Sequence, residues 1–183
     1  MNLIFKPTPI QHLESLSRFL NSPDIYLKRD DLTGLAFGGN KSRKWEYIIQ
    51  DVLKKKADVL ITWAGVQSNW CLQTAAAARK FGIDPLFVLF NSNGIQVEYD
   101  GNLFLDFILN ADIKIREAEK GKVIRWPIVK DIMNEIEREV KERGQTPYVV
   151  PIGGSLAGSS MQKPFGAYGY IESFLELIEQ SQA

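Results

Sequence analysis

A lysine at the junction of a turn and a helix is the first candidate for chemistry in this sequence. The run Gly38-Gly39-Asn40-Lys41 lies between a strand-like segment, residues 25–28, and a helical pattern. The two glycines allow a tight, open backbone that a ligand can approach. The positive end of the helix dipole and the neighbouring Arg43 and Lys44 disfavour an ammonium ion here. Lys41 is therefore a candidate nucleophilic amine, although a solvated lysine in a first helical turn explains this motif equally simply.

A second polar cluster, Gln67-Ser68-Asn69, follows an apolar run and opens an alanine-rich helix. Ligands of open α/β sheets bind at the carboxyl ends of the strands, where a helix N-terminus also offers free backbone amides to an anion such as a carboxylate. Ser68 adds a hydroxyl that can relay a proton, and Asn69 adds an amide that can hydrogen-bond to a phenolate or carbonyl oxygen. Both residues are also ordinary helix N-caps, and the two interpretations are compatible.

The elements that must position these residues follow an alternating pattern. From residue 58 onward, short apolar or β-branched runs alternate with stretches of helical period, which is typical of a parallel sheet covered by helices. We expect strands at 58–63, 85–90, 112–116 and 148–151, and therefore an α/β fold. Helical spacing predicts apolar faces between and after these strands. The faces comprise Trp45, Ile48, Ile49 and Val52; Leu103, Phe104, Phe107 and Ile108; Ile128, Ile132, Ile136 and Val140; and Ile171, Phe174, Leu175 and Ile178.

The two ends of the chain are predicted to lack a sheet of their own. We expect a helix over residues 8–20, a strand at 26–28 that runs into an acidic turn, and a final helix over 166–180. A strand and a helix without a following βα partner must pack on something else, most simply a second domain that this chain does not contain. The sequence therefore predicts an exposed apolar face formed by the N-terminal segment and residues 171–178, and with it self-association or a partner subunit.

Composition narrows the classes of function. The 183 residues are 45% hydrophobic and 24% charged, as in a globular protein with one sizeable core. Equal numbers of basic and acidic residues, 22 each, exclude a general basic field that would attract nucleic acid or membranes. One cysteine, Cys71, and one histidine, His12, are too few for a structural zinc site or an internal disulfide. We find no signal peptide, membrane span or nucleotide-binding glycine loop, and expect a cytoplasmic protein.

Taken together, the motifs resemble one family. In order along nearly the whole chain, they are Lys28-Arg29-Asp30-Asp31, the run 34–44 that contains Gly38 and Lys41, Gln67-Ser68-Asn69, and the glycine-containing runs 151–155 and 166–170. This pattern closely resembles the pyridoxal-phosphate family of D-cysteine desulfhydrase and 1-aminocyclopropane-1-carboxylate deaminase. The resemblance implies the fold type II (tryptophan synthase β-like) architecture. Residues 45–157 would form its small, three-layer α/β domain with a parallel sheet, and residues 1–44 and 158–183 would belong to a larger domain that is incomplete here.

The same resemblance implies roles for individual residues. Lys41 would form the internal Schiff base with the aldehyde of pyridoxal 5'-phosphate and later move protons at the substrate. Ser68 would assist proton transfer and bind substrate, and Asn69 would hydrogen-bond to the ring oxygen of the cofactor. The amides from Ser68 to Trp70 would hold the substrate carboxylate, with the Trp70 indole beside it; no metal is expected. Members of the family break down small amino acids to a 2-oxo acid and ammonia, and the desulfhydrase also releases sulfide.

The resemblance also implies that a part is missing. Complete members are substantially longer, and the remainder of the larger domain should carry the loop that holds the cofactor phosphate; the loop 153–160 lies instead at the return to the larger domain. Activity would then need that remainder, from another chain or a longer parent. The alternative hypothesis is a truncated, catalytically incompetent remnant that acts as a small-molecule binding or interaction domain. A homo-oligomer or a complementary subunit is expected in either case.

Overall fold

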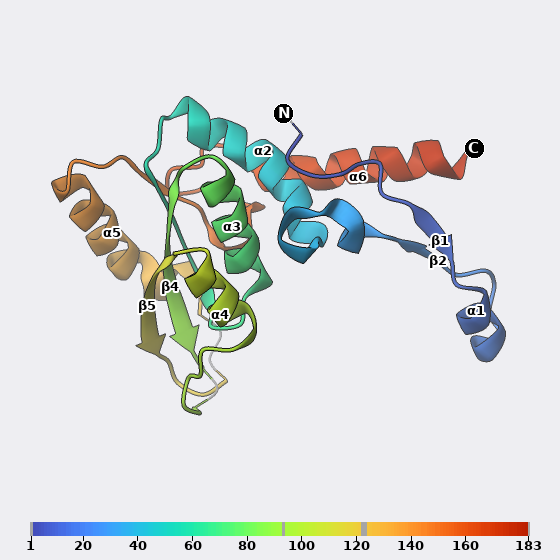
Figure 1. The fold of residues 1–183 in the computed structure, drawn as a ribbon, viewed down its shortest axis with the longest axis horizontal. Coiled ribbons are helices and arrows are strands. Elements are labelled where there is room, and N and C mark those ends of the chain that lie inside the picture. Colours follow the sequence, from blue (N-terminus) through green and yellow to red (C-terminus); the bar gives the residue numbers. More distant parts are fainter. Residues whose placement is uncertain (1, 93, 122–123, 183) are drawn as a thin grey trace.

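The computed structural model describes residues 2–92, 94–121 and 124–182. It consists of a sheet with helices on both faces and an extension that carries both ends of the chain (Figure 1). Four parallel strands form the sheet in the order β5 (Asp112–Glu117), β4 (Asp84–Asn91), β3 (Val59–Gly65) and β6 (Pro147–Val149). These strands confirm the four predicted from the sequence, and their parallel order confirms the α/β class.

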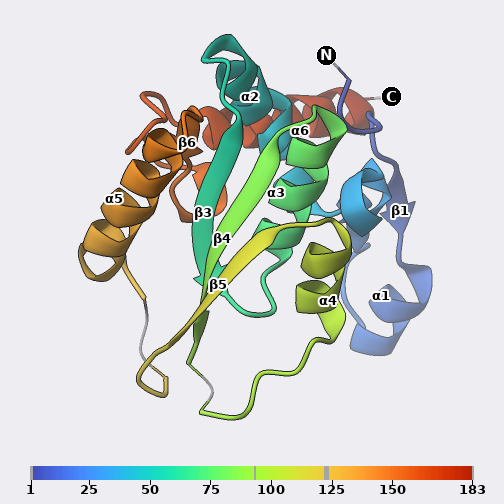
Figure 2. The same ribbon diagram turned by 60° about the vertical axis from the view of Figure 1, so that its left-hand side comes forward.

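Helices cover the two faces of this sheet in three layers (Figure 2). The helices α2 (Asn40–Lys54) and α3 (Asn69–Lys80) pack on one face, and α4 (Gly101–Ile108) packs on α3. The helix α5 (Trp126–Glu142) packs alone on the other face. The predicted apolar face of α2 is confirmed, because its members are fully buried: Trp45, Ile48, Ile49 and Val52.

The predicted faces of α4 and α5 are partly wrong. In α4 only Leu103 of the four predicted residues is buried, because this eight-residue helix contacts the domain along one narrow stripe. In α5 the buried stripe begins at Val129, whereas the side chain of Ile128 is 46% exposed. Residues 128 and 129 are both apolar, so the sequence pattern does not show which of them is buried. The sheet determines this, because packing against β3 and β4 buries Val129, Met133, Ile136 and Val140.

The N-terminal segment contains a small sheet where a longer helix was predicted. A strand, β1 (Ile10–His12), pairs antiparallel with β2 (Tyr26–Lys28), and the helix α1 is confined to Glu14–Leu20. The prediction of a helix over residues 8–13 is therefore wrong, as is the expectation that this piece has no sheet. The ladder continues beyond the strands, because Arg29 N donates to Pro9 O at 2.9 Å and Leu13 N to Ile25 O at 2.8 Å. These long-range hydrogen bonds override the local helical pattern.

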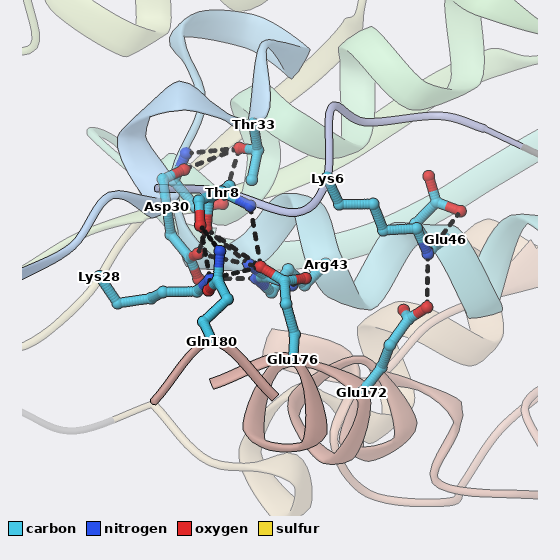
Figure 3. Close-up of polar contacts among 11 residues, drawn as sticks. Lys6, Thr8, Lys28, Asp30, Thr33, Arg43, Glu46, Glu172, Glu176 and Gln180 are labelled. Atoms are coloured by element: carbon cyan, nitrogen blue, oxygen red, sulfur yellow. Dashed lines mark hydrogen bonds and ion pairs between the residues drawn. The ribbon is translucent and has the colours of Figure 1, made fainter. Parts of the chain in front are cut away.

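A buried ionic network, centred on Arg43, joins three segments that are far apart in the sequence (Figure 3). The Arg43 side chain is 1% exposed and donates from Nε and Nη2 to the two carboxylate oxygens of Asp30, at 2.8 and 2.7 Å. On its other side Nη1 lies 3.1 Å from Glu176 Oε2 on α6 (Phe165–Ser181). Lys28 and Thr8 also contact Glu176. The network therefore fixes the N-terminal segment and α6 to the first turns of α2.

Two glycines let α6 pack with its backbone against the domain. A Cβ atom on Gly169 would lie 2.3 Å from the backbone oxygen of Arg43, and one on Gly166 would lie 2.2 Å from the backbone oxygen of Gly154. Distances this short between carbon and backbone oxygen exclude any side chain, and α6 could not move away without breaking the network of Arg43. Gly169 thus sets how closely α6 approaches α2, and Gly166 sets how closely it approaches the segment Ile152–Gly154.

The outer face of α6 is uncovered, as the sequence predicted. The side chains of Ile171 and Phe174 are 56% and 62% exposed, and Leu175 and Ile178 are exposed as well. Phe5 and Phe19 of the N-terminal segment are exposed in the same extension of the molecule. Among the residues that the structure describes, no helix is both long and apolar enough to cross a membrane. The bare face of α6 is an exposed apolar surface of the kind that other protein surfaces cover.

Candidate functional site

Lys41 lies in the first turn of α2, directly after a strained stretch of backbone. Ala36, Phe37, Gly38 and Gly39 all have positive φ angles, at 45°, 66°, 76° and 116°. A Cβ on Gly38 would lie 1.9 Å from the backbone oxygen of Asp31, so only glycine fits there. For the two non-glycine residues this conformation costs about 1–3 kcal/mol each. Such strain is typical of functional sites, and here it determines where α2 and its lysine begin.

Hydrogen bonds hold this strained stretch in place. Gly39 N donates to Asp30 O at 2.7 Å and lies 3.0 Å from Thr33 Oγ1. The Gln73 side chain of α3 donates to Gly38 O, and its Oε1 accepts from Ser42 Oγ at 2.9 Å. The turn before Lys41 is therefore fixed both by the N-terminal segment and by the helix that follows β3.

The cationic surroundings of Lys41 differ from the prediction in one respect. Arg43 points into the network with Asp30 and Glu176, so two carboxylates offset its charge. Lys44 is buried and donates from Nζ to Gly153 O at 2.5 Å and Ser155 Oγ at 2.7 Å. Burial, and secondly the charge of Lys41, lower the pKa of Lys44. Of the two predicted cationic neighbours, Lys44 is therefore the one whose charge is not offset by a carboxylate in the described contacts.

Ser68 is the N-cap of α3. Its Oγ accepts hydrogen bonds from Trp70 N at 3.1 Å and Cys71 N at 3.3 Å. The N-cap interpretation of this residue is thereby confirmed. The hydroxyl accepts from two amides and still has its own proton to donate, which is compatible with a role in proton transfer. That role stays a prediction.

Trp70 lies in the core. Its side chain is 3% exposed, its ring stacks on that of Trp45 at 5.0 Å, and its Nε1 donates to Thr62 Oγ1 at 3.0 Å. The indole therefore packs in the core and is absent from the described lining of the cavity beside Lys41, and the placement of an indole beside the substrate carboxylate stays a prediction. The helical position of Trp70 turns its side chain toward β3, and only its backbone lies at the start of α3.

A cavity of about 220 Å³ brings the two sequence motifs together. Lys41 and Asn69 both line it, together with Gly38, Gly39 and Gln73. Ser68 and Trp70 do not contribute to its described lining. The start of α2 and the start of α3 thus face one space, although Lys41 and Asn69 lie 28 positions apart in the sequence.

The cavity also includes a residue that the sequence analysis missed. Asn102, in the first turn of α4, lines the cavity and donates from Nδ2 to Asn69 Oδ1 at 2.7 Å. No short motif marks Asn102, because the contact depends on how α4 packs beside α3. A polar residue directly before the predicted apolar face that begins at Leu103 was the only local signal.

These residues fit the reactive end of a ligand such as pyridoxal phosphate. Lys41 offers an amine to an aldehyde, and Asn69 offers an amide to a neighbouring ring oxygen. The volume of about 220 Å³ lies below the ~300–1,000 Å³ of complete ligand pockets. Among the described lining residues Lys41 is the one cation, so the cavity offers no second basic side chain to a phosphate. The cavity is suited to part of the cofactor.

Comparisons with known proteins give a consistent result. The family described as "Pyridoxal-phosphate dependent enzyme" matches residues 1–182. A D-cysteine desulfhydrase of Salmonella typhi is 38% identical over 185 residues, which cover 100% of this chain and 52% of the relative. A solved structure described as an ACC deaminase homologue superposes with a TM-score of 0.83 at 39% identity, and covers 99% of this chain and 50% of that one. Diaminopropionate ammonia lyase of Escherichia coli shares the fold at 17% identity, with a TM-score of 0.66 over 97% of this chain and 47% of its own.

The matches share one further property. The chain spans about half the length of the curated relatives that it matches. This agrees with the predicted incomplete domain, and the superposition agrees with the predicted fold type II architecture.

Proposed function

Because the chain belongs to the family of pyridoxal-phosphate dependent enzymes, we propose that it is the amine-bearing part of an enzyme that breaks down a small amino acid to a 2-oxo acid and ammonia. The observation that carries this proposal is the cavity lined by both Lys41 and Asn69. The names of the relatives suggest two substrates, D-cysteine, with sulfide as a further product, and 1-aminocyclopropane-1-carboxylate.

We assign the following roles within this proposal. Bound pyridoxal phosphate would supply an electron sink for the bonds around the substrate's reacting carbon. Lys41 Nζ would hold the cofactor through its aldehyde carbon, and the same amine would move a proton at the substrate. Asn69 donates to the ring oxygen, and the free amides at the start of α3, around Ser68 and Trp70, bind the carboxylate. The Ser68 hydroxyl then assists proton transfer.

We also propose the domain boundaries that the sequence predicted. All four strands of the parallel sheet lie between residues 59 and 149, inside the proposed small domain of residues 45–157. Residues 1–44 and 158–183 meet in the network around Arg43 and form the proposed part of the larger domain.

Chemical trapping tests the proposed function directly. The purified full chain is incubated with pyridoxal phosphate, reduced with borohydride and digested, and the peptides are mapped by mass. We expect the pyridoxyl mass on the peptide that contains Lys41. A tag on a different lysine contradicts the proposal.

The second candidate function is a binding or interaction domain without a competent cofactor site. It is favoured by the lack of a second cation in the described cavity lining and by the half-length match. A folded chain that acquires no tag would support this candidate.

We propose that the exposed apolar face of α6 binds a partner, which is a second copy of the chain or a complementary subunit. Covering Ile171 and Phe174 would remove large apolar areas from water, and each Å² of apolar surface that is buried stabilises the assembly by about 25 cal/mol. Light scattering of the purified chain should therefore give a mass above 20.7 kDa, and Phe174→Glu should lower it. The matched exposed variant Phe107→Glu, on α4, should leave the mass unchanged. A monodisperse monomer at micromolar concentration contradicts the association.

A further inference from the structure

Asn69 can present either its NH₂ group or its carbonyl oxygen to the cavity, and only the NH₂ group can donate to a ligand oxygen. Its own environment does not decide between the two, because Asn69 is solvent-exposed at the first position of α3. The proposed function needs the donor. The question is which part of the molecule holds Asn69 in that orientation.

The hydrogen bonds of Asn102 fix the orientation of Asn69, and the first of them goes to the backbone oxygen of Gln67. Asn102 Nδ2 lies 3.1 Å from the backbone oxygen of Gln67, which can only accept. The atom of Asn102 at this place must therefore be its NH₂ group. The same NH₂ group lies 2.7 Å from the side-chain amide of Asn69, so the atom of Asn69 that faces it must be the oxygen.

A second set of contacts fixes Asn102 itself. Its backbone N, a donor, lies 2.8 Å from Gln67 Oε1, and Gln67 Nε2 donates to Asp100 Oδ1 at 2.7 Å. The Asn102 backbone thus orients Gln67, and the Gln67 backbone orients the Asn102 side chain. Each polarity in this chain of contacts derives from a backbone group with one possible role.

We infer that Asn102 is a positioning residue: it holds the Asn69 oxygen, so that the Asn69 NH₂ group is presented to the cavity as a donor. Among the residues that the structure describes, Asn69 Nδ2 donates no hydrogen bond, which leaves it available to a ligand. The identity of the ligand oxygen rests on the proposed function. The orientation of Asn69 does not, because it follows from the hydrogen bonds alone.

The variant Asn102→Asp reverses this polarity with almost no change in shape. The introduced carboxylate can only accept, so it loses the hydrogen bond to the Gln67 backbone oxygen, and Asn69 should turn its NH₂ group toward position 102 and present its oxygen to the cavity. A carboxylate in the first turn of α4 is favourable to the helix dipole, so the fold should be retained. The matched control is Asn110→Asp, beyond the other end of the same helix, where the side chain is exposed.

The first measurement needs no cofactor. In nitrogen-15 NMR spectra, the side-chain NH₂ of Asn69 should exchange rapidly with water in the wild type and in Asn110→Asp. In Asn102→Asp one of its protons should shift downfield and exchange more slowly, because it becomes bound to a carboxylate. Unchanged Asn69 resonances in a folded Asn102→Asp variant would overturn the inference, whatever becomes of the proposed function.

The second measurement uses pyridoxal phosphate as the probe. The concentration that gives half-maximal borohydride trapping at Lys41 should rise about tenfold in Asn102→Asp, the factor that corresponds to one charge-assisted hydrogen bond. Asn69→Ala should have a similar effect, and the double variant should add little to either. A wild type that is not trapped refutes the proposed function alone. If the losses of trapping in the two single variants add up fully in the double variant, the positioning role is refuted.

Discussion

Replacing Lys41 with arginine is expected to abolish covalent retention of pyridoxal phosphate altogether. The guanidinium group of arginine stays protonated in proteins, so it offers no free electron pair to an aldehyde, although the positive charge is kept. Lys41 is half-buried in the first turn of α2, and the stability of the fold should change by no more than about 0.5 kcal/mol. The measurement is the near-visible absorbance after incubation with the cofactor, together with the trapped mass.

The matched control is Lys54→Arg, in the last turn of the same helix. Lys54 is exposed and far from the cavity lining, so this variant should be trapped at Lys41 like the wild type. Trapping that survives in Lys41→Arg but fails in Lys54→Arg would place the reactive amine at the wrong end of α2. It would remove the basis of the proposed function.

Replacing Arg43 with methionine is expected to destabilise the fold by about 3–5 kcal/mol. The change removes the cation between the carboxylates of Asp30 and Glu176, whose side chains are 19% and 11% exposed. Water can therefore solvate neither charge fully. The network also fixes α6 and the N-terminal segment to α2, so both should loosen together. Urea unfolding of the full chain, followed by circular dichroism, measures the loss.

The control for this variant is Arg18→Met. Arg18 pairs with Glu14 at 3.5 Å, but its side chain is 72% exposed, and pairs of this kind contribute about 0–1 kcal/mol. If Arg43→Met does not fold, Arg43→Lys keeps the charge and should lie between it and the wild type. A loss below about 1 kcal/mol in Arg43→Met would mean that the network does not hold the extension in place.

The same network predicts a dependence of stability on pH. Burial alone would raise the pKa of Glu176, but the hydrogen bonds from Arg43 and Lys28 outweigh it and lower this pKa to about 2. The ordinary value is 4.5, so the folded state binds fewer protons than the unfolded state between these values. The contribution of Glu176 is therefore complete above about pH 4.5 and is lost as the pH falls toward 2.

The variant Glu176→Gln separates this contribution from that of other acids. Between pH 6 and pH 3 the free energy of unfolding should fall more steeply in the wild type than in the variant. Parallel curves would show that the Glu176 carboxylate is not coupled to Arg43 and Lys28.

The sequence by itself determined the class of fold and the position of the candidate amine, Lys41. Alternating strand and helix patterns located the four parallel strands, because buried parallel strands and amphipathic helices have different periods. The motif around Gly38 and Lys41 located the candidate amine, because only glycine tolerates the contact of Gly38 with Asp31. These features depend on local geometry, which the order of residues encodes directly.

Only the tertiary structure decided which residues share a space. The antiparallel pairing of β1 with β2 replaced a helical pattern, since its hydrogen bonds join residues 12 or more positions apart. Packing against β3 turned Trp70 into the core, and the approach of α4 to α3 brought Asn102 to Asn69. Contacts between distant segments depend on how whole elements pack, and no short stretch of sequence contains that information.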